Sequence, residues 1–530
     1  MIAAVATSTF TDLDQRIFAD LVPPEHYLRQ VAAVIDFERF RRTLEQGYSD
    51  RMGRPGIDPI LMLKLAFLSF HYRLSDRQVI ARAGTDIAFR WFLGLSSTDP
   101  LPHHTDATYF RRRHAQRLQQ TFQELLGIAR EHGLVSDRLR LKDATHVFAD
   151  AAQVTPLQLA AQVRERLLDA AEPLFPGWVA RQRQRLAALR ATTAELPDDE
   201  RLAQRIEFLR GISEELQQMI AGLPEDPAAS RPSERLQRAL QIAAKLLADH
   251  AEPKAGDRLA SAADADARVG KHGGFFLGYI LDMAMDPQSE LITAVDVLPG
   301  NAAGNGIEAA NAAALIIQEE TAQGNDVEAV SIDGAGYNGP VLRELTDPEG
   351  LNLDVTVPVP QETPRQTFGP ERFELVVLPE GSAEMTCPAG EKTRQRERNE
   401  DDTGWKYSFK ASQCAGCPLR GDCLQNPQSK RGRKVTKNDY EGEYSRARQK
   451  VGTEQYKQTR RQHPKVERKL GEMARHQGMR RARYRGRGKV RIQAVLTALV
   501  VNVKRMVKLI GRKVEEAVRT ETVRAEVCSG

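Results

Sequence analysis

The sequence predicts an α/β fold, in which a sheet with helices packed on its faces follows an all-α N-terminal domain. Two features of the apolar pattern indicate this fold. Residues 1–135 carry apolar residues at helical spacing, whereas residues 273–360 alternate short strand patterns with helices. The length of 530 residues exceeds one ordinary hydrophobic core and suggests roughly three domains.

The N-terminal domain, residues 1–135, is expected to be helical. Apolar spacing predicts helices over residues 58–73, 74–95 and 105–133. A turn sequence, GRPG at 53–56, precedes the first helix, Ser75 is the expected N-cap of the second, and Thr105 or Asp106 that of the third. The basic FRRRH sequence makes this region similar to a helix-turn-helix DNA-binding arrangement, although any small helical bundle has such a pattern.

A helical insertion follows the first predicted strand of the sheet. That strand covers residues 139–150, where LRLKDATHVFAD alternates apolar and polar residues. Residues 155–250 then return to strong helical periodicity, and prolines divide them into about four helices. We assign residues 151–262 to an antiparallel helical hairpin or small coiled-coil insertion with a structural role.

The remaining elements of the core follow residue 273. Strands are expected over residues 273–286, 290–300, 327–339 and 352–360, and helices over residues 305–324 and 340–350. The polar, cysteine-bearing residues 364–445 form a second insertion. Helical periodicity resumes near residue 444 and is broken only by the Arg- and Gly-rich residues 478–490. The core is therefore assigned to residues 136–363 and 446–518, and residues 519–530 to a tail.

Positive charge is concentrated near the C-terminus, although the formal net charge of the chain is only +5. Residues 430–513 hold 27 Lys and Arg against 6 Asp and Glu, a net charge of +21. This asymmetry indicates a polyanionic partner, most often nucleic acid, with a solvated basic face as the alternative. The side chains expected to contact DNA phosphates are Arg460, Arg461, Arg475, Arg480, Arg481, Arg483, Arg485, Arg487 and Lys489.

No membrane or export segment is expected. Residues 1–16 lack the basic and apolar regions of a signal peptide, and the longest apolar run, 494–501, is far below the roughly 20 residues that span a bilayer. A cytoplasmic protein is the simplest interpretation. Clustered cysteines then indicate metal binding rather than disulfides.

Three acidic residues occupy positions that suit metal-dependent chemistry. Asp143 lies within a predicted strand, Asp333 ends another, and Glu467 lies on a helix. If they converge, they would hold two Mg²⁺ (or Mn²⁺) ions about 3.5–4 Å apart and act on a phosphodiester. As alternatives, Asp333 is only a turn residue before glycine, and Glu467 is only a surface residue paired with Arg468 or Lys469.

A series of motifs resembles the DDE transposases of bacterial insertion sequences. The motifs are LKDATHVFAD, GYILDMAMD with LITAVDVLPGN, SIDGAGYNG, CPAG with CAGCPLRGDC, HPKVERKLGEMARHQGMRRARYRGRGKV, and NVKRM. The N-terminal residues 53–113 are similar to the helical domain that often precedes this core. The resemblance covers nearly the whole chain in the right order.

The resemblance implies an RNase H-like core of the retroviral-integrase type, with a mixed sheet flanked by helices. It assigns the catalytic and metal-binding triad to Asp143, Asp333 and Glu467. It also implies an enzyme that cuts DNA at the ends of its own element, usually terminal inverted repeats, and joins the freed 3′-OH to target DNA. Because two DNA ends are paired, we expect a homodimer or larger assembly on DNA, at the nucleoid.

Two features depart from the family pattern. Many related transposases place a Tyr, an Arg and a Lys at set distances around the glutamate, but here His463 stands four positions before Glu467 and Ala474 seven after it. The candidates for those supporting roles, which stay unassigned, are Tyr456, Arg460, Arg461 and Arg475. The long helical insertion is also unlike a minimal core.

The second insertion contains a cluster of four cysteines. The spacing C-x26-C-x2-C-x5-C comprises Cys387, Cys414, Cys417 and Cys423. Four thiolates on tight turns suit a structural, tetrahedral Zn²⁺ ion, with reduced unpaired cysteines or a redox CxxC as alternatives. Trp405, Tyr407 and Phe409 are expected to form the small core of this module, and Cys528 lies outside it.

The sequence therefore predicts a Mg²⁺-dependent DNA transposase. Two rival interpretations remain: a non-catalytic, sequence-specific DNA-binding protein, and a structure-specific nuclease of the same fold that cuts without joining. Substitution of a triad carboxylate separates the first rival, because DNA binding alone does not require the carboxylates.

Overall fold

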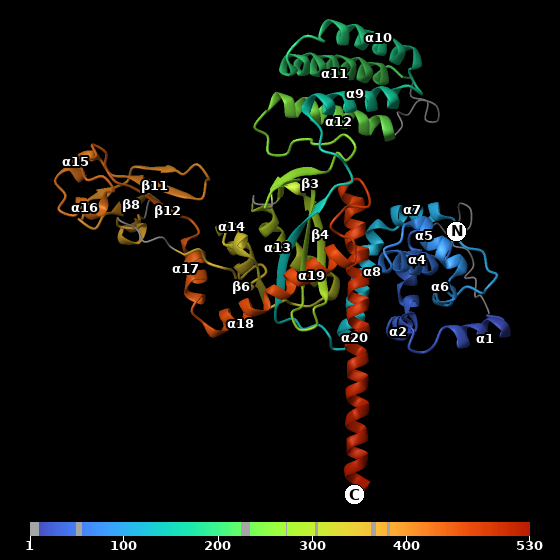
Figure 1. Cartoon of the computed structure of the whole chain (residues 1–530). Helices are drawn as coiled ribbons and strands as arrows, with labels where there is room; N and C mark the ends of the chain where they lie inside the picture. The colour runs from blue at the N-terminus through green and yellow to red at the C-terminus, as the bar shows by residue number, and fades with distance from the viewer. Residues whose placement is uncertain are drawn as a thin grey trace.

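The structure is a computed structural model that describes residues 10–48, 56–223, 234–271, 273–302, 306–361, 367–378 and 382–529, with residues 514–529 described by their backbone alone. A central sheet with helices around it carries three appended units (Figure 1). The N-terminal helices and the cysteine-bearing module lie on opposite sides of the sheet, and the helical insertion lies at one end. Among the described helices, none is both long and apolar enough to cross a membrane.

The N-terminal region is helical, as predicted. Its elements are α1 (Asp12–Leu21), α2 (Tyr27–Val34), η1 (Phe37–Phe40), α3 (Arg41–Glu45), α4 (Pro59–His71), α5 (Asp76–Thr85), α6 (Ile87–Leu93), α7 (His104–Arg113) and α8 (Ala115–Glu131). Ser75 caps α5, as expected. The single helix expected over residues 74–95 is divided at Asp86, whose carboxylate caps α6. Of the turn expected at 53–56, only Gly56 is among the described residues.

The N-cap expected at Thr105 or Asp106 is wrong by two or three residues. His103 caps α7 instead, and its backbone N–H donates to the Asp106 carboxylate over 2.8 Å. Asp106 is thus the third helical residue of a capping box, in which the two side chains satisfy each other's backbone donors. The sequence pattern permitted either arrangement because Thr, Asp and His can all accept from a helix N-terminus.

The central sheet is mixed. Its strands are β1 (Arg140–Phe148), β2 (Arg268–Lys271), β3 (Phe275–Met285), β4 (Ile292–Pro299), β5 (Ala329–Ser331) and β6 (Asp354–Thr356). β3 pairs antiparallel with β1, β2 and β4, whereas β1 pairs parallel with β5, and β5 with β6. The strands that the alternating pattern predicted are all present, within shorter bounds for β5 and β6.

Helices cover both faces of this sheet. They are α13 (Ile307–Gln323), α14 (Gly339–Thr346), α19 (Pro464–His476) and α20 (Arg487–Ser529). Arg140 and Lys142 of β1 bond with residues of α13, while α19 packs on the same strand. Successive side chains of a strand point to opposite faces, so Leu141 and Asp143 lie on the face of the sheet opposite to Arg140 and Lys142.

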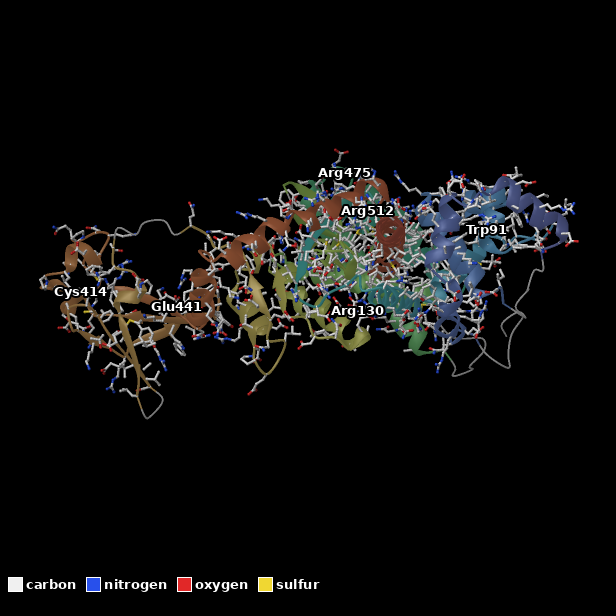
Figure 2. The ribbon with its side chains drawn as sticks, turned by 90° about the horizontal axis from the view of Figure 1, so that it is seen from below. Trp91, Arg130, Cys414, Glu441, Arg475 and Arg512 are labelled. Carbon is white, nitrogen blue, oxygen red and sulfur yellow. The ribbon has the colours of Figure 1, made fainter. Side chains whose placement is uncertain are left out.

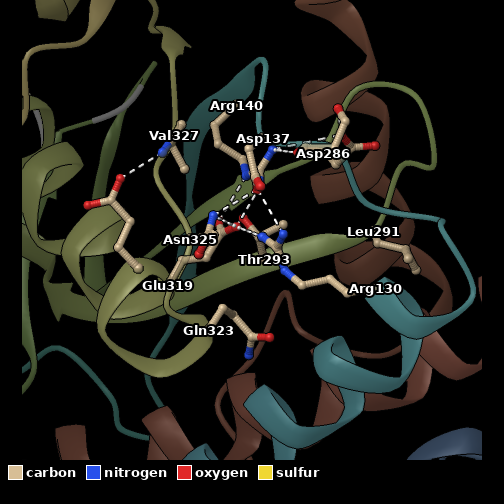
Figure 3. A network of polar contacts seen from close by, with 12 residues as sticks. Arg130, Asp137, Arg140, Asp286, Leu291, Thr293, Glu319, Gln323, Asn325 and Val327 are labelled. Carbon is tan, nitrogen blue, oxygen red and sulfur yellow. Dashed lines mark hydrogen bonds and ion pairs between the residues drawn. The ribbon is translucent and has the colours of Figure 1, made fainter.

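A buried polar network joins the N-terminal helices to the sheet (Figure 3). The fully buried Arg140 lies 2.5 Å from the Glu319 carboxylate of α13, and Arg130 of α8 reaches the same oxygen over 2.8 Å. Asp137 pairs with Arg130, and Asp286 lies 3.7 Å from Arg140. Each charged group therefore has an opposite partner, which the cost of burying charge requires.

The helical insertion contains four helices, as the prolines predicted. They are α9 (Pro156–Ala171), α10 (Pro176–Thr192), α11 (Asp198–Ala221) and α12 (Glu234–Ala251). Pro156 and Pro176 stand at first-turn positions of their helices, where a missing N–H costs nothing, and Pro197 precedes α11. The four helices enclose an apolar core of their own, which includes Leu167 and Leu209.

The cysteine-bearing module consists of short elements that the polar sequence did not reveal. β7 (Glu374–Val377), β8 (Ala383–Thr386) and β9 (Lys392–Thr393) form one antiparallel sheet, and β10 (Arg396–Arg398), β11 (Gly404–Ser408) and β12 (Lys434–Asn438) form another. Two short helices, α15 (Ala411–Ala415) and α16 (Arg420–Cys423), lie between β11 and β12, and η4 (Pro370–Arg372) precedes β7. Tyr407 and Phe409 are buried in the module core as expected, and Trp405 packs against it partly buried.

The C-terminal helices differ from the expected pattern at two places. α17 (Glu441–Lys450) and α18 (Glu454–Gln462) lead from the module back to α19, as helical periodicity predicted. α20 begins at Arg487, so the expected break over 478–490 ends at Gly486, whose φ is +97°. The helix continues to Ser529, through the expected tail, because residues 512–529 contain neither Gly nor Pro to stop it.

Candidate catalytic site

Asp143 lies where β1 extends beyond its partner β5. The two strands pair only at Arg140 and Leu141, so Asp143 lies just past the paired segment. Its carboxylate accepts the Ala144 N–H over 2.8 Å. Burial raises the pKa of Asp143 to about 7, and the neighbouring negative charges of two other carboxylates add to the shift. A strand aspartate with such a pKa is typical of a functional site.

Asp333 stands two residues after β5, at the edge where Asp143 lies. It caps a short 3₁₀ turn, η3 (Gly334–Gly336), and accepts the Ala335 N–H over 3.2 Å. The turn-residue interpretation is therefore correct locally. It is incomplete, because the same carboxylate also lies within 4.8 Å of Asp143.

Glu467 projects from the first turn of α19, which begins at Pro464 as predicted. The side chain is exposed. Within the described part of the chain Glu467 makes no ion pair, and Lys469 pairs with Glu472 over 2.9 Å instead. The alternative interpretation, a surface pair with Lys469 or Arg468, is therefore not what the structure contains.

Two clusters of possible metal ligands share Asp143. In one, ligand atoms of Asp143, Glu308 and Asp333 lie within 4.8 Å of one another; in the other, those of Asp143, His463 and Glu467 do. The structure thus brings both Asp333 and Glu467 to Asp143 but places them in different clusters. This arrangement offers two adjoining cation positions with Asp143 common to both.

Glu308 and His463 were not predicted as site residues. Glu308 lies in the first turn of α13, 3.6 Å from the Lys142 ammonium, and its carbonyl accepts from Lys142 over 2.8 Å. His463 lies one helical turn before Glu467, and a spacing of four residues places two side chains on one face of a helix. This spacing was the sequence feature from which His463 could have been predicted as a site residue. No comparable signal marked Glu308, because its neighbours at the site are distant in sequence.

His463 is buried where α18 meets α19. Its Nδ1 lies 3.1 Å from the Ser331 hydroxyl of β5. Burial lowers the pKa of His463 to about 4, and the positive charges of Arg460 and Lys142 lower it further. The ring is therefore neutral at physiological pH, with one nitrogen able to accept a hydrogen bond or a metal ion.

Arg460 lies beside the carboxylates rather than on an open surface. Its guanidinium donates to the Ile332 carbonyl over 3.0 Å and to the Ser331 hydroxyl over 3.4 Å. Arg480 is likewise fixed, because it donates to the His146 carbonyl over 3.2 Å. Both cations are held close to the end of the strand that carries Asp143.

The other basic residues expected at DNA fall into two groups. Arg483 is half-buried over the Phe70 ring at 4.6 Å, and its role in this structure is packing between the N-terminal region and residues 478–486. Arg485 is exposed and pairs with Asp150 over 3.2 Å. The remaining exposed side chains are Arg461, Arg475, Arg481, Arg487 and Lys489. In Figure 2, Arg475 lies over the central body, well away from Cys414.

The basic sequence FRRRH contributes fewer free charges than expected. Arg111 of α7 is buried and forms a two-point ion pair with Asp76 of α5, at 2.6 and 2.8 Å. Arg113 lies over the Tyr48 ring. These contacts hold the N-terminal helices together, so the predicted recognition role has to rest on other side chains of α7.

The four clustered cysteines lie in the module and form no disulfide. Burial raises the pKa of the Cys423 thiol, and the three other cysteines lie close enough to raise it further. Among the described residues, however, no three thiols have sulfur atoms within 4.8 Å of one another. The four thiols lie near one another but do not form a tetrahedral site. Zinc binding therefore stays a prediction.

Models of two known protein families match parts of the chain. A family model described as "Transposase domain (DUF772)" matches residues 16–113, and one described as "Transposase DDE domain" matches residues 386–507. Over these two segments the chain is similar to DDE transposases. The second match contains Glu467 and the four clustered cysteines, whereas Asp143 and Asp333 lie outside both matches. No curated protein and no solved structure matches the chain.

Proposed function

We propose that this protein is a DDE transposase that cleaves DNA at the ends of its own insertion sequence and joins the 3′-OH ends to target DNA. The reaction would proceed by metal-dependent phosphodiester hydrolysis and transesterification. The observation that carries the proposal is the convergence on Asp143 of carboxylates from the end of β5 and from α19. Carboxylates from distant parts of the sequence meet at one point only where the fold is built to hold them.

The order of strands supports an RNase H-like core. Along the sheet the order is β2, β3, β1, β5, β6, and β4 also pairs with β3. β3 is antiparallel to its neighbours, and the last three strands of the order are mutually parallel. Asp143 lies on the central strand of this order, and Asp333 follows the strand beside it. The resemblance seen in the sequence implies carboxylates at the corresponding two places.

The ligands present fit hard divalent cations. Asp143, Asp333 and Glu467, joined by Glu308, present oxygen atoms, which Mg²⁺ and Mn²⁺ prefer. Burial is the main cause of the raised pKa of Asp143, and the negative charges of Asp333 and Glu308 add to it; a bound cation would offset both. Bound at these residues, two such ions would stabilise the attacking and leaving oxygens of the phosphodiester.

The protein side chains would orient the site around that chemistry. Lys142 is buried between Asp282, 3.1 Å away, and Glu308, and it therefore fixes the position of the Glu308 backbone and carboxylate. Arg460 holds the backbone that leads from β5 into Asp333 through its bond to the Ile332 carbonyl. These contacts limit the motion of the carboxylates before substrate binds.

The DNA backbone would be bound by the exposed cations near α19 and the start of α20. Arg461, Arg475, Arg481, Arg487 and Lys489 lack ion-pair partners among the described residues, so they are free to neutralise phosphates. The partners proposed are the two element ends and the target DNA. Pairing two ends makes a homodimer or larger assembly at the nucleoid the expected form.

The cysteine-bearing module is proposed to bind one structural Zn²⁺ ion. Its apolar core is small, with Phe373, Met385 and Val435 around Tyr407, and Cys387, Cys414 and Cys423 pack against that core. Small modules of this size often need a metal for stability. A metal ion would draw the thiols together from the positions that they occupy here.

The experiment that tests the function uses a labelled DNA fragment carrying the sequence that flanks the reading frame. Wild-type protein and Glu467→Gln are incubated with it, each with Mg²⁺ or with EDTA. We expect nicking and joining that need metal and vanish in the variant while DNA binding persists. Equal binding by both proteins without cleavage would favour a non-catalytic DNA-binding protein, and cleavage without joining would favour a nuclease.

A further inference from the structure

The surroundings of His463 differ from those of a histidine buried for packing. The ring is 2% exposed, and one of its nitrogens lies within 4.8 Å of ligand oxygens of both Asp143 and Glu467. An imidazole buried for packing is normally surrounded by apolar side chains or by its own hydrogen-bond partners. This ring borders two carboxylates.

The two ring nitrogens are in unequal environments. Nδ1 lies 3.1 Å from the Ser331 hydroxyl, which Arg460 also approaches. Nε2 is buried and has no hydrogen-bond partner among the described residues. A buried polar atom without a partner is unfavourable, so such an atom at a functional site points to a missing ligand.

Histidines that bind metals show the same difference in hydrogen bonding between their two ring nitrogens. A metal-ligating imidazole almost always donates its other N–H to an oxygen atom, which fixes the tautomer and the ring orientation. Ser331 is placed to accept such a bond from Nδ1, on a strand that is itself part of the sheet. Nε2 then carries a lone pair at the buried, unpartnered position.

We propose that His463 is a metal ligand of the catalytic site, together with Asp143 and Glu467. The inference rests on the proposed function, since it concerns the same divalent cations. It makes the two cation positions chemically different. The position at Asp143, Asp333 and Glu308 offers oxygen alone, whereas the position at Asp143, Glu467 and His463 offers oxygen and nitrogen.

The difference predicts a preference among metals. Imidazole is a favourable ligand for Zn²⁺ and Ni²⁺, binds Mn²⁺ more weakly, and is a poor ligand for Mg²⁺, which prefers oxygen and keeps its waters. Under the proposal the oxygen-only position suits Mg²⁺, and the position at His463 gains affinity when Mn²⁺ replaces Mg²⁺. An arginine at residue 463 would instead repel a cation from that position.

The test is pulsed electron paramagnetic resonance of Mn²⁺ bound to the full-length protein, without DNA. We expect modulation from a directly bound ¹⁴N nucleus in the wild type, changed to the ¹⁵N pattern when the protein is made with [¹⁵N]histidine. His463→Asn should remove the modulation and lower Mn²⁺ affinity at one position by roughly tenfold or more. The matched control is His476→Asn, an exposed histidine at the end of the same helix, which should change neither.

The outcomes separate this inference from the proposed function. Mn²⁺ that binds in a manner dependent on Asp143, but shows no histidine nitrogen, would overturn the role of His463 and leave the carboxylate site standing. Mn²⁺ binding that is unaffected by Asp143→Asn would refute the metal centre itself. Because the ¹⁵N comparison uses only wild-type protein, a folding defect in His463→Asn does not prevent the decision.

Discussion

Asp143→Asn should make the metal-free protein more stable at pH 8, although it removes a carboxylate of the proposed catalytic site. Burial and the neighbouring carboxylates raise the pKa of Asp143 from its ordinary value of 3.8 to about 7 in the folded chain. A raised pKa means that the folded state favours the protonated form. The stability that this group contributes is therefore complete below pH 3.8 and is lost as the pH rises through about 7.

The magnitude follows from the size of the shift. A difference of about three pKa units corresponds to about 4 kcal/mol of unfolding free energy lost by the wild type between pH 4 and pH 8. Asparagine has nearly the same shape, can keep the hydrogen bond from Ala144 and does not ionise. The variant should therefore match the wild type near pH 4 and exceed it by up to about 4 kcal/mol at pH 8.

The assay is thermal unfolding in EDTA at a series of pH values, where about 4 kcal/mol corresponds to roughly 10 °C in the melting temperature of a core this size. Mg²⁺ at 100 times Kd should narrow this difference by about 2.7 kcal/mol, because only the wild type gains that binding free energy. Asp150→Asn, on an exposed carboxylate after the same strand, is the control. A variant that is less stable than the wild type at pH 8 without metal would refute the reasoning.

Three further predictions concern other parts of the chain. Glu319→Gln should cost roughly 3–5 kcal/mol, measured by thermal unfolding, because it leaves buried arginines without a counter-charge, whereas Glu131→Gln on an exposed pair should change little. Arg481→Ala should reduce the slope of log K against log salt for DNA binding by about one, with Mn²⁺ affinity unchanged. Cys414→Ser should abolish binding of about one zinc, measured by metal analysis, and should make the module sensitive to protease, whereas Cys528→Ser should not.

The parts of the fold that were predictable are those with a local pattern. Alternating apolar residues gave the strand that carries Asp143, and the position of Asp333 at a strand end followed from the pattern around it. Prolines divided the insertion correctly, because proline marks helix starts by a local backbone restriction. Glu467 could be placed on a helix for the same local reason.

The parts that escaped prediction depend on contacts between distant residues. Arg140 and Glu319 are 179 positions apart, and neither has a local feature that reveals its partner. Glu308 joins the site only because α13 begins beside β1. The module strands are two to five residues long, too short for alternation to be distinguished from irregular polar sequence.

The position of α19 offers a reason for a carboxylate within a basic segment. Glu467 is exposed, without an ion pair among the described residues, in a sequence that offers many cations. A surface glutamate there would be expected to pair with a neighbour along the helix. Instead it shares a cluster with Asp143, and the basic side chains around it stay available to DNA phosphates.

The buried network around Glu319 bears on which phosphodiester bond the proposed reaction would cleave. α8 packs against both α13 and α20, and Arg130 ties it to Glu319, which also holds Arg140 of the strand that carries Asp143. The N-terminal helices are therefore joined to β1, the strand that carries Asp143, by packed helices and buried ion pairs rather than by a flexible linker. If those helices recognise the element end, the distance from the recognised bases to the cleaved bond is set by the fold itself. Loss of Glu319 would then loosen the choice of cleavage position before it abolished cleavage.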